Sequence, residues 1–218
     1  MDIGSIFALL AAVSFSGNLV SARRGTLQAG ESFTAMLIIV FVGMLFFSPV
    51  LIFGVDWGGL WSLSWYAFVF LGVAGVINFV VGMFLIYSSI RLIGANRAAP
   101  LVGTGPFYAV IFGVLLLGET FTIYLVIGVL CIVAGATLVS IRKEEETAKM
   151  RGRGIISGLV GAFCLGISGV LIKAVIDEVG SPFVAAFISY IAAASVMGVI
   201  LLWRKGQREQ LTQLSRPA

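Results

Sequence analysis

The strongest constraint on the fold is a pair of long apolar runs separated by three residues. The runs, Asn96–Leu117 and Phe121–Ile141, flank Gly118, Glu119 and Thr120. An α-helix rises about 1.5 Å per residue, so a run of about 20 residues spans the ~30 Å hydrocarbon layer of a membrane. So short a connection leaves room only for a tight turn. We therefore expect two antiparallel transmembrane helices joined as a hairpin.

Five further segments are apolar and long enough to cross a bilayer. They are residues 3–22, 33–53, 65–90, 154–174 and 183–203. Of the 218 residues, 60% are hydrophobic and 11% are charged, whereas about a quarter of the residues in a soluble domain are charged. We predict an all-α polytopic membrane protein with about seven transmembrane helices.

Composition also argues against several classes of function. Histidine is absent, which removes Ser-His and Cys-His catalysis and histidine zinc sites. Cys131 and Cys164 lie inside predicted spans, so a disulfide framework is not expected. The basic residues are scattered between spans and do not gather with aromatic residues, which disfavours nucleic acid as a partner. We expect no enzyme activity, no cofactor and no metal.

The positions of the basic residues predict the orientation. With seven alternating spans, all but one of the 14 lysines and arginines fall on the same side, and Lys173 is the exception. Cytoplasmic loops carry the excess of lysine and arginine. We therefore expect a multi-pass protein of the cell membrane. Its charged linker, 142–153, and its polar tail, 204–218, would be cytoplasmic and its N-terminus outside.

Pro106 falls at the middle of the run 96–117 and should interrupt that helix. It has no N–H to donate to the carbonyl of Val102, and its ring crowds the preceding turn. Gly103, Thr104 and Gly105 expose further backbone at the same depth. Within lipid, free backbone is tolerated only against protein or a water-filled cavity. We expect this kinked, glycine-lined segment to border a solute path.

This pattern carries a family resemblance. Small residues precede a mid-helix proline followed by Phe-Tyr-Ala; Leu-Gly-Glu-Thr comes next, and an apolar helix with regular glycines follows. The combination resembles the EamA-type repeat of the drug/metabolite transporter superfamily, and it covers Ile3 to about Ile141 as one five-helix unit. The resemblance implies a secondary transporter built from two such repeats.

A second copy of the repeat begins after the linker. FSGNLVSARR at residues 15–24 aligns weakly with ISGVLIKAVI at residues 167–176. Five predicted spans separate the two copies, so the second would enter the membrane inverted, as in many secondary transporters. We predict a first repeat at 1–141 and the first two helices of a second at 154–203. A fragment of a ten-helix protein, a homo-oligomer or a partner chain would account for the missing helices.

The candidate substrate-binding residues are polar side chains inside spans, because such groups usually face away from lipid. Asn18 and Asn78 offer amide donors and acceptors, although an interhelical hydrogen bond would also explain each of them. Tyr87 closes its span and is a further candidate, or simply an interfacial residue. In the family, the first, third and fourth helices of each repeat line a central cavity. The resemblance therefore implies that Thr104, Pro106 and Tyr108 lie near substrate.

Glu119 and Lys173 are candidates for coupling. Glu119 matches the glutamate of the family's hairpin motif, but it could simply cap the following helix. Lys173 could face substrate or extend to the membrane surface, with Asp177 or Glu178 as its partner. No carboxylate lies deep in a predicted span, so proton exchange through a central acid is disfavoured.

One stripe of small residues predicts close helix packing. Gly154, Gly158, Ala162 and Gly166 recur every four residues in the sixth predicted span. A weaker stripe in the fifth span, Gly128, Ile132 and Ala136, could oppose it.

The favoured function is a secondary transporter that exports or exchanges small polar metabolites, such as amino acids, by alternating access. Two alternatives stay open at this point. One is a flippase for lipids or lipid-linked sugars, and the other is a non-transporting membrane subunit that packs on a partner protein.

Overall fold

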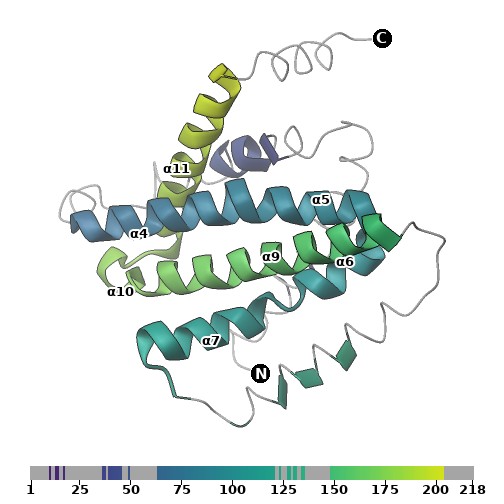
Figure 1. Ribbon diagram of the computed structural model, residues 1–218. Helices are drawn as coiled ribbons and strands as arrows, with labels where there is room; N and C mark the ends of the chain where they lie inside the picture. Colours follow the sequence, from purple (N-terminus) through teal and green to yellow (C-terminus); the bar gives the residue numbers. More distant parts are fainter. Residues whose placement is uncertain are drawn as a thin grey trace.

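A computed structural model describes two continuous stretches, residues 63–120 and 148–203, together with short pieces elsewhere. The pieces are residues 10, 13, 14, 17, 36, 37, 39–45, 49, 123, 127, 128, 130, 131, 134 and 135. In the described residues the regular elements are all helical (Figure 1). The predicted all-α class is therefore confirmed.

Four helical stretches in the described residues are long and apolar enough to cross a membrane. They are Trp65–Ile93, Ala95–Leu117, Gly152–Lys173 and Pro182–Trp203. Each matches a predicted span to within a few residues. The other three predicted spans, 3–22, 33–53 and 121–141, lie mainly outside the described residues, so the total of seven stays a prediction.

The first of these spans is one continuous helix with an irregular middle. It consists of α4 (Trp65–Gly75), the π-helix η1 (Val76–Gly82) and α5 (Met83–Ile93). Ser64 begins it as N-cap, where its hydroxyl accepts a hydrogen bond from the N–H of Tyr66 at 3.2 Å. Gly94, with a φ of +77°, ends it. That single residue separates α5 from the next helix, so the two spans form a tight hairpin.

The second span is divided into α6 (Ala95–Val102) and α7 (Gly105–Leu117). Gly118 ends α7 in the left-handed region with a φ of +66°, and its N–H donates to the carbonyl of Val114 at 3.1 Å. This is the glycine cap that commonly ends a helix. It turns the chain at the hairpin predicted from residues 118–120.

The third and fourth spans follow the linker. They are α9 (Ala148–Lys173) and α11 (Pro182–Trp203), joined through the short helix α10 (Ile176–Val179). Figure 1 shows α9 lying between the α4–α5 helix and α6–α7, and α9 contacts both. Helix α11 packs mainly against α4 and η1.

Small residues let α9 approach both of its neighbours closely. A Cβ placed on Gly158 would lie 2.9 Å from Oγ of Ser89 in α5. One placed on Gly166 would lie 2.8 Å from the carbonyl oxygen of Gly105 in α7. The predicted packing role of this stripe is confirmed. Its partners are α5, α6 and α7; a Cβ on Gly128, in the helix proposed to oppose it, would meet nothing within 4 Å.

Contacts between helix ends give the direction of each span. The Ser89 hydroxyl in α5 donates to the carbonyl of Gly154 near the start of α9 at 2.8 Å, so α5 and α9 are antiparallel. Lys173 at the end of α9 pairs with Glu119 just after α7, so α7 and α9 are parallel. Two parallel spans in one chain require an odd number of crossings between them. The predicted span 121–141 would supply one.

The outward faces of the bundle are apolar. Leu115 in α7 is 71% exposed and Trp203 at the end of α11 is 87% exposed. A soluble protein rarely exposes large contiguous apolar patches. Lipid contact accounts for these faces, and Trp65 and Trp203 stand at span ends, where tryptophan anchors at the interface.

The crossing of α4 and α11 generates a stability prediction. A Cβ on Gly75 would collide with the carbonyl oxygen of Ser189, whose hydroxyl bonds the carbonyl of Leu71 at 3.1 Å. Gly75→Ala should therefore lower the free energy of unfolding in detergent by about 1–3 kcal/mol, measured by denaturant titration. Gly169→Ala is the matched control, because nothing lies within 4 Å of that position. Equal effects of the two substitutions would contradict the close crossing.

Candidate substrate path between α9 and two irregular helices

The break between α6 and α7 is closed by local hydrogen bonds. Gly103 and Thr104 form a turn in which the N–H of Gly103 donates to the carbonyl of Ala99 at 2.8 Å. The N–H of Thr104 donates to the carbonyl of Leu101 at 3.2 Å, and the Thr104 hydroxyl donates to the same carbonyl at 2.6 Å. The turn therefore satisfies part of its own backbone at a depth where water is scarce.

Two prolines surround this turn. Pro106 is the second residue of α7, a position where its missing N–H costs little. The predicted interruption around Pro106 is thus present. Pro100 lies inside α6 and was not identified from the sequence. It removes a second intrahelical hydrogen bond, so α6 is weakened from within.

Most of the side chains predicted to lie near substrate at this break already contact other parts of the protein. The Thr104 hydroxyl is bonded to its own helix. Tyr108 packs edge-on against Phe163 of α9, with ring centroids 5.6 Å apart. Pro106 is exposed. In this conformation the surface of the turn therefore consists mainly of backbone and glycine atoms, with few side-chain hydrogen-bond donors that lack a partner among the described residues.

Asn78 occupies an unusual position in the neighbouring span. It lies in η1, where its carbonyl accepts the N–H of Met83, five residues along the chain. Its side-chain oxygen Oδ1 is buried and has no hydrogen-bond partner within the described residues. Burying such an atom unpaired costs about 1–3 kcal/mol. Single-turn π-helices frequently occur at functional sites. Among the predicted substrate-binding residues, Asn78 is therefore the best-supported candidate.

Tyr87 is also buried with an unpaired hydroxyl within the part of the chain described, and it is only 1% exposed. It belongs to a core cluster that joins α5 to Met36, Leu37 and Val40 and to Met197 of α11. This cluster packs around the ring. Tyr87 therefore contributes chiefly to helix packing, with a polar atom that a ligand could reach only if the cluster opened.

Helix α9 separates the predicted residues into two groups. Asn78 and Tyr87 lie on the span that packs against Gly161 and Cys164 of α9. Thr104, Pro106 and Tyr108 lie on the span that packs against Gly166 and its neighbours. The predicted residues do not form one cluster in this conformation. Asn18 lies outside the described residues.

The two coupling candidates form an ion pair with each other. Nζ of Lys173 contacts Oε1 of Glu119, and the side chains are 62% and 37% exposed. The Glu119 carboxylate folds back over Gly113, where a Cβ would lie 2.7 Å from Oε2. The expected pairing of Lys173 with Asp177 or Glu178 is wrong. Glu178 instead accepts the N–H of Ser64 at 2.5 Å and ties α10 to the start of α4.

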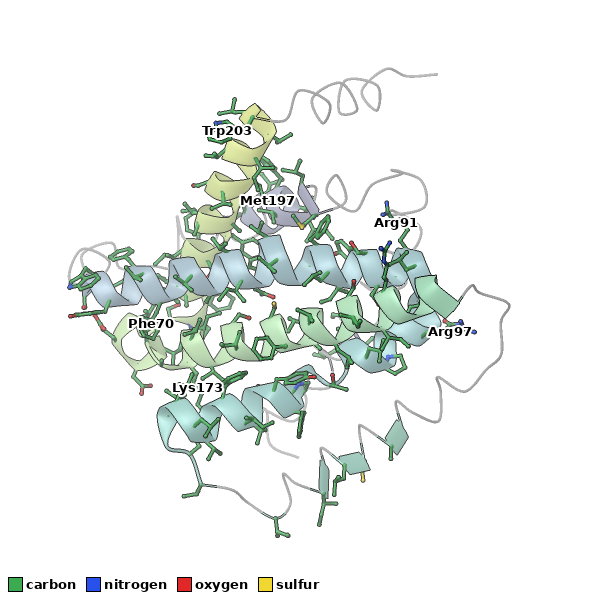
Figure 2. All side chains as sticks on the ribbon, viewed as in Figure 1. Phe70, Arg91, Arg97, Lys173, Met197 and Trp203 are labelled. Atoms are coloured by element: carbon green, nitrogen blue, oxygen red, sulfur yellow. The ribbon has the colours of Figure 1, made fainter. Side chains whose placement is uncertain are left out.

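Charged groups are confined to the ends of the described spans (Figure 2). Among the described residues no group of three histidine, cysteine, aspartate or glutamate side chains could hold a metal ion. Cys131 and Cys164 are both free, as expected from their positions. The polar groups in the middle of the described bundle are therefore amide, hydroxyl and backbone groups.

The comparison with known families agrees with this architecture. The model of the EamA-like transporter family matches residues 2–141, more than half of the chain. This chain belongs to the EamA-like transporter family. The match ends at Ile141, where the charged linker follows. No curated protein and no solved structure shows significant similarity to the chain.

Family membership identifies the protein as a membrane protein of a transporter family, which is compatible with the expectation that it is no enzyme. The assignment of 154–203 to a second repeat lies beyond the matched residues and stays a prediction.

The ion pair of this EamA-like protein can be tested by charge exchange. Lys173→Glu places two carboxylates in contact and should lower the free energy of unfolding in detergent by about 1 kcal/mol, since the pair is exposed. The double variant Glu119→Lys/Lys173→Glu should recover most of that loss in a double-mutant cycle. Asp177→Lys is the control and should show no coupling to Lys173. Additive effects at 119 and 173 would rule out the pair.

Proposed function

We propose that this chain is a secondary transporter that exports or exchanges small polar metabolites, such as amino acids, by alternating access. Its membership of a transporter family supports transport in general. The proposed substrate class and mechanism rest on the position of the irregular backbone within two of the spans. Asn78 in η1 is the fourteenth of 29 residues in its span, and Pro106 is the twelfth of 23 in the next.

Two antiparallel neighbouring spans are thus both irregular at the middle of the membrane. Secondary transporters bind their substrates near the bilayer midplane, at helices whose regular hydrogen bonding is interrupted there. The π-turn at Asn78 and the turn at Gly103–Thr104 have this character and this depth. Backbone groups released at either turn would be available to a polar solute.

The chemistry of the described mid-span groups favours a solute without net charge. Asn78 offers an acceptor oxygen without a protein partner among the described residues. The described carboxylates and ammonium groups lie toward the span ends, at positions such as Glu119 and Lys173. An isolated charge is expensive to bury without a counter-charge. A zwitterionic or neutral hydrogen-bonding metabolite avoids that cost.

Movement would occur at the α6–α7 break. Gly103 and Gly105 carry no side chain to oppose a change in angle, and the turn is held mainly by hydrogen bonds to Ala99 and Leu101. Helix α7 could therefore tilt against α9 while α6 stays packed in the α5–α6 hairpin. Opening at the end of α7 would require the Glu119–Lys173 pair to separate, or α9 to move with α7.

Asn78→Leu tests the binding role directly. Leucine has nearly the same volume but cannot accept a hydrogen bond, so the KM for transported solute should rise about tenfold. Thermal stability should stay equal or increase, because an unpaired buried oxygen is removed. The protein is purified together with any partner chain that remains bound to it. Its transport of a panel of labelled metabolites is then measured in proteoliposomes.

Asn96→Leu is the matched control, because Asn96 is exposed at the start of α6. It should leave KM unchanged. A loss of stability in Asn78→Leu without a change in KM would assign Asn78 to an interhelical hydrogen bond and remove it from the substrate path.

Pro106→Ala tests the hinge. Alanine restores an N–H that can bond to the carbonyl of Val102 and extend regular helix across the turn. The maximal transport rate should fall severalfold while insertion and KM are retained. Pro182→Ala, at the first residue of α11, is the control and should have little effect. An unchanged rate in Pro106→Ala would contradict the hinge.

A further inference from the structure

Apart from Lys173, which pairs with Glu119, the charged side chains described in the bundle are segregated by sign between its two ends. The described carboxylates gather where α7 and α9 finish, and they are Glu119, Asp177 and Glu178. Arginines gather at the opposite end. Figure 2 shows Arg91 and Arg97 at that end, far from Lys173. Arg153, which begins the transmembrane part of α9, joins them.

Packing brings the ends of three helices together around these arginines. The last turn of α5 lies directly against α9, because a Cβ on Gly154 would sit 3.2 Å from Cβ of Leu92. Arg91 precedes Leu92 and Arg153 precedes Gly154, so the two arginines lie next to residues that are in contact. Arg97 lies in the first turn of α6, which starts after the single residue Gly94. We call these three residues the arginine end.

The arginine end lies at the depth of lipid headgroups. Arg91 stands two residues before the end of one apolar span, Arg97 two residues after the start of the next, and Arg153 one residue after the start of a third. Arg91 and Arg153 are exposed, whereas Arg97 is 8% exposed. Arginines at span ends extend toward the membrane interface.

An apolar surface continues from the arginine end into the membrane. Ile156 lies one turn along α9 from Arg153 and is 64% exposed. A ligand with a charged head and an apolar tail would contact both parts of this surface. A free anion would use only the arginines.

We propose that the arginine end binds the headgroup phosphate of anionic phospholipids. A guanidinium group presents paired N–H donors that match two phosphate oxygens, which favours phosphate over other headgroup chemistry. Each basic residue near a membrane surface strengthens binding to anionic lipid about fivefold. This inference does not depend on the transported substrate.

The test is lipid binding to delipidated protein in neutral detergent, followed by native mass spectrometry. Phosphatidylglycerol and phosphatidylcholine are added separately at equal concentrations. Wild-type protein should bind phosphatidylglycerol in preference to phosphatidylcholine. Arg153→Gln should weaken phosphatidylglycerol binding about fivefold and Arg91→Gln/Arg153→Gln about 25-fold, with phosphatidylcholine binding unchanged.

Two controls separate the headgroup site from net charge. Lys173→Gln removes the same charge at the opposite end and should leave phosphatidylglycerol binding unchanged. Arg153→Lys keeps the charge but loses the paired N–H donors, so it should bind phosphatidylglycerol more weakly than wild type and more tightly than Arg153→Gln. Circular dichroism confirms that each variant keeps its helical content.

Three results would overturn the proposal. One is equal binding of the two lipids by wild-type protein. Another is a loss of phosphatidylglycerol binding in Lys173→Gln that is as large as the loss in Arg153→Gln. The third is displacement of phosphatidylglycerol by millimolar inorganic phosphate, which would make the arginine end a site for free anions.

Discussion

Close contact between backbones at α9 holds the described bundle together. In lipid the hydrophobic effect does not drive helices together, so association depends on van der Waals packing and hydrogen bonds between surfaces that fit. Gly161 and Gly166 bring α9 against Ile86 of α5 and Gly105 of α7 at distances that no side chain would permit. The Ser89–Gly154 hydrogen bond fixes one end of the same contact. Two irregular spans are thereby held on either side of a regular one.

That arrangement also explains why the irregular backbone is tolerated. Helix α9 packs against both η1 and α7, so neither irregularity is surrounded by lipid alone. The Thr104 hydroxyl donates to the carbonyl of Leu101. The π-turn replaces i→i+4 hydrogen bonds with i→i+5 ones, such as the bond from the N–H of Met83 to the carbonyl of Asn78. The side-chain oxygen of Asn78 is buried without a hydrogen-bond partner among the described residues. This unpaired atom is the reason for proposing that Asn78 contacts the solute.

Local features of the chain could be predicted from its sequence. Span positions follow from length and hydropathy, and the break near Pro106 follows from a missing N–H. The π-turn could not be predicted, because no proline or other local signal marks it; in the structure its last residue, Gly82, lies against Cys164 and Gly161 of α9. Tyr87 and Tyr108, which are predicted to lie near substrate, also make packing contacts that the sequence does not reveal. Helices that are apolar on every face give no periodic signal of which side turns inward.

Lys173 is the exception to the predicted charge asymmetry. It is the one basic residue that the seven predicted spans would place away from the positively charged side. Glu119 pairs with it, and the missing side chain of Gly113 makes room for that carboxylate. The pair gives the lysine a counter-charge at the end of the bundle. The same contact joins the hairpin after α7 to the end of α9. Any motion that opens this end must therefore break the pair or carry both helix ends together.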